Sequence, residues 1–460
     1  MSQQATTTFV REINDHFGDR MITSDGALAH YAQSEGHHRY APPSVVVQPT
    51  NIDDVQRAVS AAIASGLPII GYGAGTSLEG NAAAVNGGLC IDFSRMDRIL
   101  EVNAEDLLCV IEPGVTREQL NTELRTSGLF FPVDPGANAS LGGMISTRAS
   151  GTTTVRYGSM RDNVLALKVV TADGSLIRTG TRARKSASGY DLTHLFTGSE
   201  GTLGLIVEAT LRLHGQPDKI LAATWDFETV QGAVDTVITT IQSAVPMARM
   251  ELLDRAAIRA CNAFSGLGWP EKPMLFLEFH GSEASVADQL ALVRMIGEGN
   301  GGGTLNFATA TEDRNALWKA RHQALPSARA LIPGAVVWTT DICVPISKLC
   351  EAITLVQSAV DKARLTAPIL GHVGDGNFHT LFVLPPEDET AWAAAKSINE
   401  MMIDFALSVG GTCTGEHGIG LGKRHAMCRE HGNEAVAVMR RVKNALDPKG
   451  LLNPGKLFLD

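Results

Sequence analysis

Two histidines in the C-terminal half of the chain stand seven residues apart around a glycine-rich turn. The segment reads GHVGDGNFH over residues 371–379, so the histidines are His372 and His379. On a straight strand this odd spacing would place the two imidazoles on opposite faces. The Gly-Asp-Gly turn lets the chain bend so that both rings can converge. Imidazoles bind Zn²⁺ and other divalent transition metals, so the segment predicts part of a metal site.

A carboxylate and a further imidazole follow in the sequence GEHGIG, residues 415–420. Glu416 and His417 are adjacent, so their side chains diverge, and one can bind a metal while the other faces a different atom. Two imidazoles and one carboxylate leave coordination positions open, which is typical of a catalytic metal. Zinc is the expected metal, and Fe(II) or Mn(II) stay open. Each histidine alone would be explained as a hydrogen-bonded core residue, and nearby Cys413 as a buried thiol.

A glycine-rich segment, GYGAGTSLEG, covers residues 71–80. Glycines let backbone N–H groups approach an anionic oxygen, and Thr76 and Ser77 add hydroxyl donors. A dinucleotide-binding G-x-G-x-x-G sequence must open a helix directly. Residues 81–88 lead into a further strand instead, which disfavours a Rossmann-type NAD site. On its own the segment is as typical of a structural turn as of a ligand site.

Two more tracts of small and hydroxyl-bearing residues follow in the same half of the chain. Residues 132–158 combine glycines with serines and threonines, and residues 198–204 read GSEGTLG. Such residues suit a polar cofactor held in a cleft. Three tracts of this kind in one domain are hard to explain by turn chemistry alone.

The elements that must position these residues are predicted from periodicity. Residues 44–48 and 67–70 are expected to be strands on either side of a helix over residues 51–65, with Thr50 or Asn51 as its cap and Gly66 as its end. Residues 164–171 and 175–179 predict a hairpin. From about residue 220 longer helical stretches alternate with strands. We expect an α+β chain with a domain boundary near residue 217.

Composition and charge exclude several classes of protein. The 460 residues include 39 Lys and Arg against 49 Asp and Glu, a net charge of −10, which argues against a nucleic-acid partner. With 44% hydrophobic residues, the chain can bury the cores of two or three domains. The 7 scattered cysteines fit a reducing compartment and provide no iron–sulfur motif.

The compartment is expected to be the cytoplasm. The N-terminal residues resemble neither a secretory signal nor a transit peptide. No apolar run approaches the ~18 residues of a membrane span. Peripheral association with a membrane stays open.

The three tracts, their order and their spacing resemble the flavin-binding domain of the vanillyl-alcohol oxidase/p-cresol methylhydroxylase superfamily. The sequence DPKGLLNPGK, residues 447–456, resembles the C-terminal flavin-contacting segment of that superfamily. The resemblance implies a two-domain α+β flavoprotein. An N-terminal helical segment (1–40) would precede an α+β FAD-binding domain (41–217). An α+β substrate or cap domain (218–460) would hold an antiparallel sheet, the metal site and the C-terminal segment.

The resemblance implies FAD, with its pyrophosphate on the 73–77 loop. Members with covalently attached flavin often use a histidine in the first loop, and residues 71–88 contain none, so FAD is expected to be non-covalent. The residues implied to contact FAD are Gly73, Ala74, Gly75, Thr76, Ser77, Gly80, Pro135, Gly136, Ser140, Gly142, Gly143, Ser150, Gly151, Val155, Tyr157, Gly158, Glu200, Gly201, Gly204, Ile206 and Asn453.

The histidine pair and the GEHG sequence are similar to those of the D-2-hydroxy-acid dehydrogenase branch, which includes D-lactate dehydrogenases and glycolate oxidase subunits. The resemblance implies His372, His379 and Glu416 as metal ligands and His417 as the catalytic base. It also suggests that Arg321, in the sequence WKARH, binds the substrate carboxylate, for which a guanidinium offers a bidentate fork. A surface arginine on a helix is an equally simple explanation.

One departure within the branch bears on the substrate. Members that take a second carboxylate carry a lysine in a Tyr-Lys-Tyr-Asp segment and an asparagine shortly after the second histidine. This chain has WTTD at residues 338–341 and Thr380-Leu381 after His379. The difference favours a short monocarboxylate such as lactate over 2-hydroxyglutarate.

We therefore expect FAD- and metal-dependent oxidation of a short D-2-hydroxy acid, with D-lactate as the first candidate. Electrons would pass to a cytochrome, a quinone, or a flavoprotein or iron–sulfur partner. Three alternatives stay open: the flavin subunit of a glycolate oxidase complex, a D-2-hydroxyglutarate dehydrogenase, and a non-redox flavoenzyme resembling alkylglycerone-phosphate synthases. A homodimer is also left open.

Overall fold

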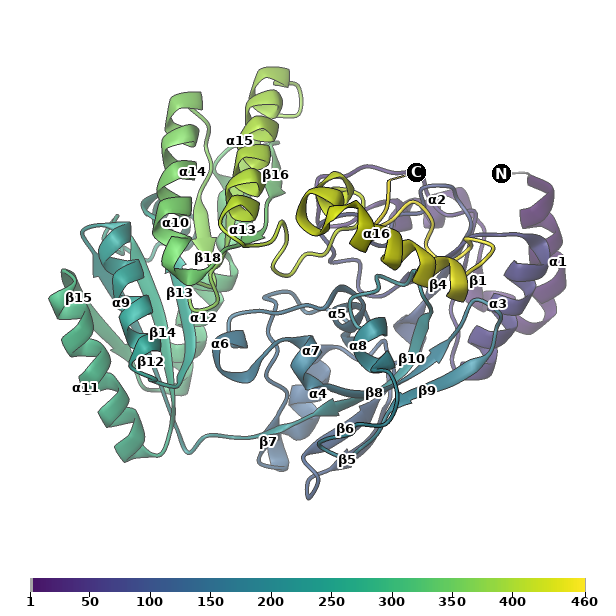
Figure 1. Ribbon diagram of the computed structural model, residues 1–460, viewed down its shortest axis with the longest axis horizontal. Helices are drawn as coiled ribbons and strands as arrows, with labels where there is room; N and C mark the ends of the chain where they lie inside the picture. The colour runs from purple at the N-terminus through teal and green to yellow at the C-terminus, as the bar shows by residue number, and fades with distance from the viewer. Residues whose placement is uncertain (1–2, 460) are drawn as a thin grey trace. The chain divides into compact units, whose positions relative to one another are not determined.

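The computed structural model describes residues 3–459, and its contacts divide the chain into two compact units. The first unit takes residues up to 149, residues 159–216 and residues from 416 onward. The second unit takes residues 150–158 and 217–415. These units differ from the expected domains in two places. Residues 150–158 belong to the second unit, although they were expected in the FAD-binding domain, and residues from 416 onward belong to the first unit, although they were expected in the C-terminal domain. Figure 1 labels the elements of both units.

The first unit begins with a four-stranded sheet in the order β1-β2-β4-β3. Strands β2, β4 and β3 are parallel, and β1 is antiparallel to β2. Helix α3 connects β2 to β3 and begins as predicted, because the Asn51 side chain accepts the Asp54 N–H; Gly66, with φ of 65°, ends it. Helices α1 and α3 contact each other. The bounds are α1 (Gln3–Phe17), β1 (Met21–Ile22), α2 (Asp25–Leu28), β2 (Val45–Val47), α3 (Ile52–Ser65), β3 (Ile69–Tyr72) and β4 (Leu89–Asp92).

A five-stranded antiparallel sheet follows in the first unit, in the order β5-β6-β10-β8-β9. The predicted hairpin is confirmed as β8 and β9, whose turn is closed by the Thr171 N–H donating to Ser175 O. The remaining bounds are β5 (Ile99–Asn103), β6 (Leu108–Ile111), α4 (Arg117–Glu123), β7 (Leu129–Phe130), α5 (Leu141–Thr147), α7 (Met160–Asn163), β8 (Val164–Val170), β9 (Leu176–Gly180), α8 (Leu192–Phe196), β10 (Leu205–Arg212), β11 (His214–Gly215) and α16 (Met427–Leu446).

The second unit is built on an eight-stranded sheet in the order β15-β12-β14-β13-β18-β19-β16, with β17 also paired to β19. All its pairings are antiparallel, as predicted for this half of the chain. The strand bounds are β12 (Lys219–Phe227), β13 (Met247–Leu253), β14 (Met274–Gly281), β15 (Gly302–Ala308), β16 (Val336–Thr339), β17 (Ile342–Cys343), β18 (Ile369–Gly371) and β19 (Asn377–Leu384).

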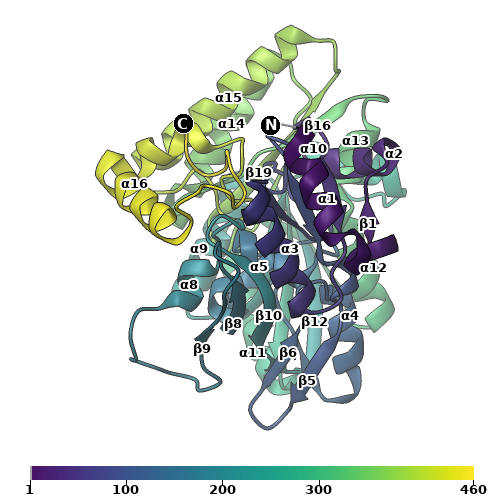
Figure 2. The same ribbon diagram turned by 90° about the vertical axis from the view of Figure 1, so that its right-hand side faces the viewer.

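Helices cover both faces of this sheet (Figures 1 and 2). One layer contains α9, α11, α14 and α15, which contact one another and the strands, and the other contains α6, α10, α12 and α13. The helix bounds are α6 (Thr154–Tyr157), α9 (Val230–Gln242), α10 (Arg255–Ser265), α11 (Glu283–Gly299), α12 (Thr311–His322), α13 (Ala324–Ala330), α14 (Leu349–Ala363) and α15 (Glu389–Ser408). The expected α+β class with an antiparallel sheet is confirmed.

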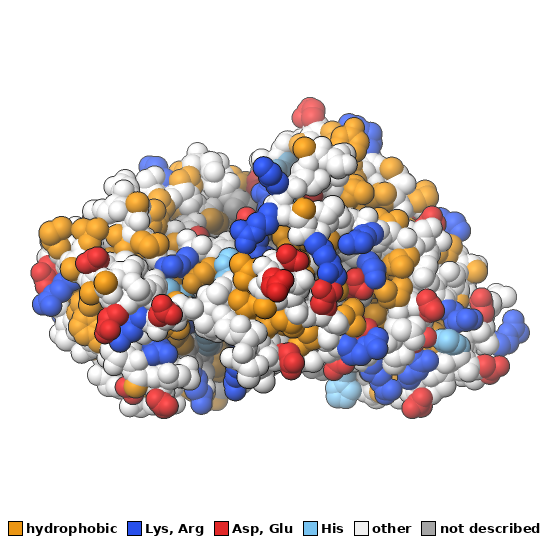
Figure 3. Space-filling view, turned by 90° about the horizontal axis from the view of Figure 1, so that it is seen from below, with side chains coloured by type: hydrophobic (Ala, Val, Ile, Leu, Met, Phe, Trp, Pro, Cys, Tyr) orange, Lys and Arg blue, Asp and Glu red, His pale blue; other side chains and the backbone are white. Residues whose placement is uncertain are grey.

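The surface is mixed in charge. On the face drawn in Figure 3, acidic side chains are interspersed among lysines and arginines. Within residues 3–459, every helix is too short or too polar to cross a membrane.

Candidate functional site

The loop after β3 has the features of a cradle for a polar ligand. Ser77 Oγ and Ser140 Oγ are buried and make no hydrogen bond within the described part of the chain. A Cβ at Gly73 would lie 2.1 Å from Ser140 Oγ, so any other residue here would force the Ser140 side chain to rotate away. Gly75 has φ of 71°, which also favours glycine. Because an unsatisfied buried hydroxyl costs ~1–3 kcal/mol, these two side chains indicate a bound partner that accepts or donates hydrogen bonds.

The residues implied to contact FAD are divided between the two units. Those in the first unit lie in the loop after β3, around the start of α5, in and just before β10, and in the C-terminal segment: Gly73, Ala74, Gly75, Thr76, Ser77, Gly80, Pro135, Gly136, Ser140, Gly142, Gly143, Glu200, Gly201, Gly204, Ile206 and Asn453. Those in the second unit lie in and around α6: Ser150, Gly151, Val155, Tyr157 and Gly158.

Within the second unit, α6 packs beside the turn that joins the two histidines of the 371–379 segment. A Cβ on Gly374 would lie only 2.7 Å from Val155 Cγ2. The Tyr157 hydroxyl lies 2.7 Å from His280 Nδ1, and His280 Nε2 lies 2.8 Å from Glu278 Oε1. The unit therefore brings an expected flavin-contacting segment next to an expected metal-binding segment.

The two histidines converge, as the glycine-rich turn predicts. His372 follows β18 directly and His379 lies in β19, the neighbouring antiparallel strand. Their ring centroids are 5.5 Å apart, with the ring planes at 82° to each other. His372 Nδ1 lies 2.7 Å from Glu251 Oε1, and His379 Nδ1 lies 3.0 Å from the carbonyl oxygen of Thr340. Both rings thus meet a protein oxygen at Nδ1, which is typical of a histidine that binds a metal through Nε2.

Arg321 is not a surface residue. Its side chain, on α12, is 5% exposed, and it pairs with Glu251, which is completely buried. Arg321 Nε and Nη2 lie 3.1 Å and 2.5 Å from Glu251 Oε2. Burial alone would raise the pKa of Glu251, but the charges of His372 and Arg321 hold this pKa below its ordinary value. A buried, ionised carboxylate therefore links the predicted substrate arginine to a predicted metal ligand.

The GEHGIG loop is held in the first unit by Glu200. Its Oε1 accepts the Ile419 N–H at 2.7 Å, and its Oε2 accepts the Gly420 N–H at 2.9 Å. Asn81 Nδ2 donates to Glu200 Oε2 at 2.7 Å and lies 3.4 Å from the carbonyl oxygen of His417. Burial raises the pKa of Glu200 above its ordinary value. Through these hydrogen bonds, the Glu200 side chain holds the loop that carries the predicted base, His417.

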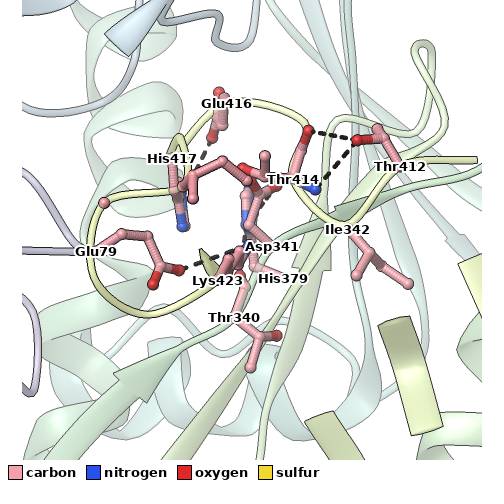
Figure 4. A network of polar contacts seen from close by, with 12 residues as sticks. Glu79, Thr340, Asp341, Ile342, His379, Thr412, Thr414, Glu416, His417 and Lys423 are labelled. Carbon is pink, nitrogen blue, oxygen red and sulfur yellow. Dashed lines mark hydrogen bonds and ion pairs between the residues drawn. The ribbon is translucent and has the colours of Figure 1, made fainter. Parts of the chain in front are cut away.

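A second pair of charged residues lies near His417 in the same unit (Figure 4). Lys423 Nζ is 3.5 Å from Glu79 Oε1, and both side chains are buried. Burial alone would raise the pKa of Glu79, but Lys423 and His38 hold this pKa below its ordinary value, and so does His417. His417 Nε2 is 3.8 Å from Glu416 Oε1, so Glu416 and Glu79 both contribute negative charge near the imidazole.

The chain that leads to the GEHG sequence is anchored in the second unit by Asp341. Thr414 Oγ1 donates to Asp341 Oδ2 at 2.6 Å, and Asn377 Nδ2 donates to Asp341 Oδ1 at 2.6 Å (Figure 4). Gly415 is the last residue of this unit, and Glu416 follows it directly in the chain. Thr414, two residues before Glu416, is thus held by Asp341. Asp341 in turn is held by Asn377 in β19, the strand that also carries His379.

Sequence reasoning missed most of the residues that hold the predicted groups, among them Glu251, Asp341 and Asn81. Glu251 stands between Met250 and Leu252 in a strand whose other residues, apart from Arg249, are buried and apolar. A charged residue in such a strand must be paired, so this pattern could have marked it. Asp341 and Asn81 carry no comparable signal, because their partners are distant in sequence.

Comparison with known proteins gives consistent results for the whole chain. Residues 43–180 match the family described as "FAD binding domain", and residues 216–457 match "FAD linked oxidases, C-terminal domain". The chain is 47% identical over 445 residues to "Probable D-lactate dehydrogenase, mitochondrial" from Danio rerio, covering 96% of this chain and 90% of that one. It is 44% identical to "D-lactate dehydrogenase [cytochrome], mitochondrial" from Arabidopsis thaliana, covering 93% of this chain and 75% of the relative.

Two further matches concern the branch and the fold. "Glycolate oxidase subunit GlcD" from Bacillus subtilis is 31% identical, covering 90% of this chain and 89% of that one. The solved structure of p-cresol methylhydroxylase with substrate bound matches with a TM-score of 0.81 at 16% identity, covering 100% of this chain and 98% of that chain. The structural match supports the fold alone. Together, the matched families and relatives show that the chain belongs to the FAD-linked oxidases, on the branch that includes the D-lactate dehydrogenases.

Proposed function

We propose that this FAD-linked oxidase is a D-lactate dehydrogenase that also requires a divalent metal. The proposal rests above all on the buried pair His372 and His379, whose Nδ1 atoms both meet protein oxygens. The names of the relatives from Danio rerio and Arabidopsis thaliana favour D-lactate as the substrate.

The residues that would hold FAD are those of the loop after β3, the start of α5, the segment before β10 and α6. Their glycines and the unpaired hydroxyls of Ser77 and Ser140 suit such a ligand. His372 and His379 would bind the metal through Nε2, with Glu416 as the third ligand. When bound, FAD accepts the hydride from C2 of the substrate, and the metal supplies Lewis acidity at the 2-hydroxyl oxygen.

The protein's own residues then have three tasks. Arg321 binds the substrate carboxylate and orients C2. His417 takes the proton of the 2-hydroxyl, for which an imidazole with an unperturbed pKa of ~6.5 is suited near neutral pH. Glu251 and Thr340 hold the two imidazoles by Nδ1. Loss of the hydroxyl proton and of the hydride from C2 converts D-lactate to pyruvate.

The two electrons would then pass to an acceptor other than O₂. A cytochrome is the first candidate, since the Arabidopsis relative is named for one, and a quinone or an iron–sulfur partner is the alternative. Zinc is the expected metal, with manganese and iron as alternatives.

An anaerobic visible spectrum of the purified protein before and after addition of D-lactate tests this function. A flavin spectrum that bleaches is the expected result. A flavin that bleaches with glycolate but not with D-lactate would instead support the role of a glycolate oxidase subunit. A flavin that neither acid reduces, in protein loaded with Zn²⁺ or Mn²⁺, contradicts the proposal.

A further inference from the structure

A row of buried or largely buried charged residues crosses one face of the large sheet of the second unit. Arg249 and Glu251 lie two residues apart on β13, so they share a face, and Glu278 is paired with Arg249 on the neighbouring strand β14. Helix α12 covers this face and contributes Trp318 and Arg321. Charges buried in this way need partners, and each partner can be identified from the contacts.

Glu251 stands at the centre of the row and divides its two oxygens between two partners. Oε1 meets His372 Nδ1, and Oε2 meets Nε and Nη2 of Arg321. An ionised carboxylate only accepts hydrogen bonds, so His372 must carry its proton on Nδ1. This contact at Nδ1 turns Nε2 to the opposite side of the ring, which is the orientation in which a histidine binds a metal.

The same carboxylate fixes the orientation of the guanidinium. Arg321 offers five N–H donors in a rigid planar fork, and Glu251 takes the Nε–Nη2 side of that fork. Within the described residues, Arg321 Nη1 makes no hydrogen bond to another side chain or to the backbone. The end of the fork, formed by Nη1 and Nη2, is therefore left for an anion.

We propose that Glu251 is a positioning residue that sets both the metal-binding state of His372 and the direction of the Arg321 fork, so that the substrate carboxylate is bound end-on. This inference rests on the proposed function, because it assigns Glu251 to the metal and substrate of that reaction. It adds a residue that links the two binding events. Loss of Glu251 must then weaken both of them together.

The neighbouring strand supplies a matched control, Glu278. Its carboxylate is also buried and contacts a histidine and a tryptophan, His280 and Trp318, at 2.8 Å and 2.5 Å. It also lies 3.5 Å from Arg249. Neither His372 nor Arg321 is among its partners. Glu278→Gln therefore removes the same charge from the same face without touching the two groups in question.

The experiment strips the purified proteins with a chelator and titrates them with Zn²⁺, and separately measures steady-state turnover of D-lactate. Glu251→Gln is expected to raise the Kd for Zn²⁺ by ~10–100-fold, the usual effect of losing the partner of a ligating histidine. It is also expected to raise KM for D-lactate. Glu278→Gln, which contacts neither His372 nor Arg321, is expected to bind Zn²⁺ as the wild type does, even if it melts at a lower temperature.

Three results would overturn the inference. If the wild type binds Zn²⁺ and Glu251→Gln binds it equally well with an unchanged KM, Glu251 has no positioning role, while the proposed function stands. If the wild type itself binds no divalent metal, both the metal site and the role of Glu251 are wrong. Equal losses in Glu251→Gln and Glu278→Gln would show a general effect of removing a buried charge and would also contradict the inference.

Discussion

His417 illustrates how the side chain of a predicted base depends on residues far away in sequence. Its carbonyl oxygen lies near Asn81, and Glu200 accepts the N–H groups of Ile419 and Gly420 in the same loop. Glu79 and Glu416 place negative charge near its ring. Negative charge near an imidazole stabilises its protonated form, which is the form that a base reaches after taking a proton.

We predict that the His417→Ala variant still binds FAD. The rate at which D-lactate reduces its flavin should fall ~10²–10⁴-fold, the usual contribution of a general base. The flavin absorbance of the purified variant reports FAD, and stopped-flow reduction reports the rate. His431→Ala, at a side chain that is 40% exposed, is the control and should reduce normally. Normal bleaching in His417→Ala would refute the assignment of His417 as the base.

The loop 416–420 is an element with no regular secondary structure, so its conformation depends on side-chain acceptors. Glu200 accepts the N–H groups of both Ile419 and Gly420. Asn453 Nδ2 in turn donates to the carbonyl oxygen of Glu200 at 2.6 Å. The resemblance implies that Glu200 and Asn453 contact FAD, and their side chains also connect the segment before β10 with the C-terminal segment.

We predict that Glu200→Gln loosens this loop while FAD stays bound. An amide can accept only through its single oxygen, so one charge-assisted hydrogen bond worth about 1.5–3 kcal/mol is lost. Hydrogen exchange should show less protection at Ile419 and Gly420, and kcat for D-lactate should fall. Glu208→Gln on β10, which removes an ion pair with Lys168 on β8, is the control. Unchanged exchange in Glu200→Gln would mean that Glu200 does not hold the loop.

Helix α10 provides a pH-dependent prediction at the same scale. Its N-cap, Asp254, accepts the N–H groups of Ala257 and Ile369, and burial raises its pKa from 3.8 to about 6. Because the folded state binds this proton more tightly than the unfolded chain, the stabilising contribution is present below pH ~4 and is lost as the pH rises through about 6.

In the Asp254→Asn variant, the stability should therefore no longer fall at this position as the pH rises through about 6. Asparagine caps helices as well as aspartate does, and it carries no charge to bury. We expect the variant to be more stable than the wild type by about 1–3 kcal/mol at pH 7 and equally stable at pH 4, measured by chemical denaturation. A lower stability at both pH values would show that the ionised carboxylate is needed for the cap.

For the whole molecule, the main feature is that the C-terminal residues return to the first unit. The backbone of Leu451 and Asn453 exchanges hydrogen bonds with Ile69 in β3. Leu452 is completely buried in the core that includes β2, β3 and β4. The first unit is thus closed by residues that are more than 350 positions away from β3.

Leu452→Ala should consequently destabilise the first unit by about 2–5 kcal/mol, as expected for a large-to-small change in a core. Thermal unfolding and retention of FAD on gel filtration would measure this. Leu459→Ala, seven residues later at a position that is 48% exposed, should change stability by less than about 0.5 kcal/mol. Similar melting of the two variants would mean that the C-terminal segment does not complete the core.

The sequence by itself determined the local features of this protein. Periodicity and caps predicted α3, the β8–β9 hairpin and the α+β class, since these depend on residues close in the chain. The glycine-rich turn predicted that His372 and His379 converge, because a turn is also local. The glycine tracts and the C-terminal segment indicated a flavoprotein through their resemblance to the vanillyl-alcohol oxidase/p-cresol methylhydroxylase superfamily.

Only the tertiary structure decided what surrounds those features. It assigned residues 150–158 to the second unit and the C-terminal residues to the first. It also revealed that Glu251 joins Arg321 to His372 and that Glu200 holds the loop of His417. These partners are 70 to 219 positions apart in sequence. Burial makes each such charge depend on a particular partner, and the partner is chosen by packing, which no local pattern records.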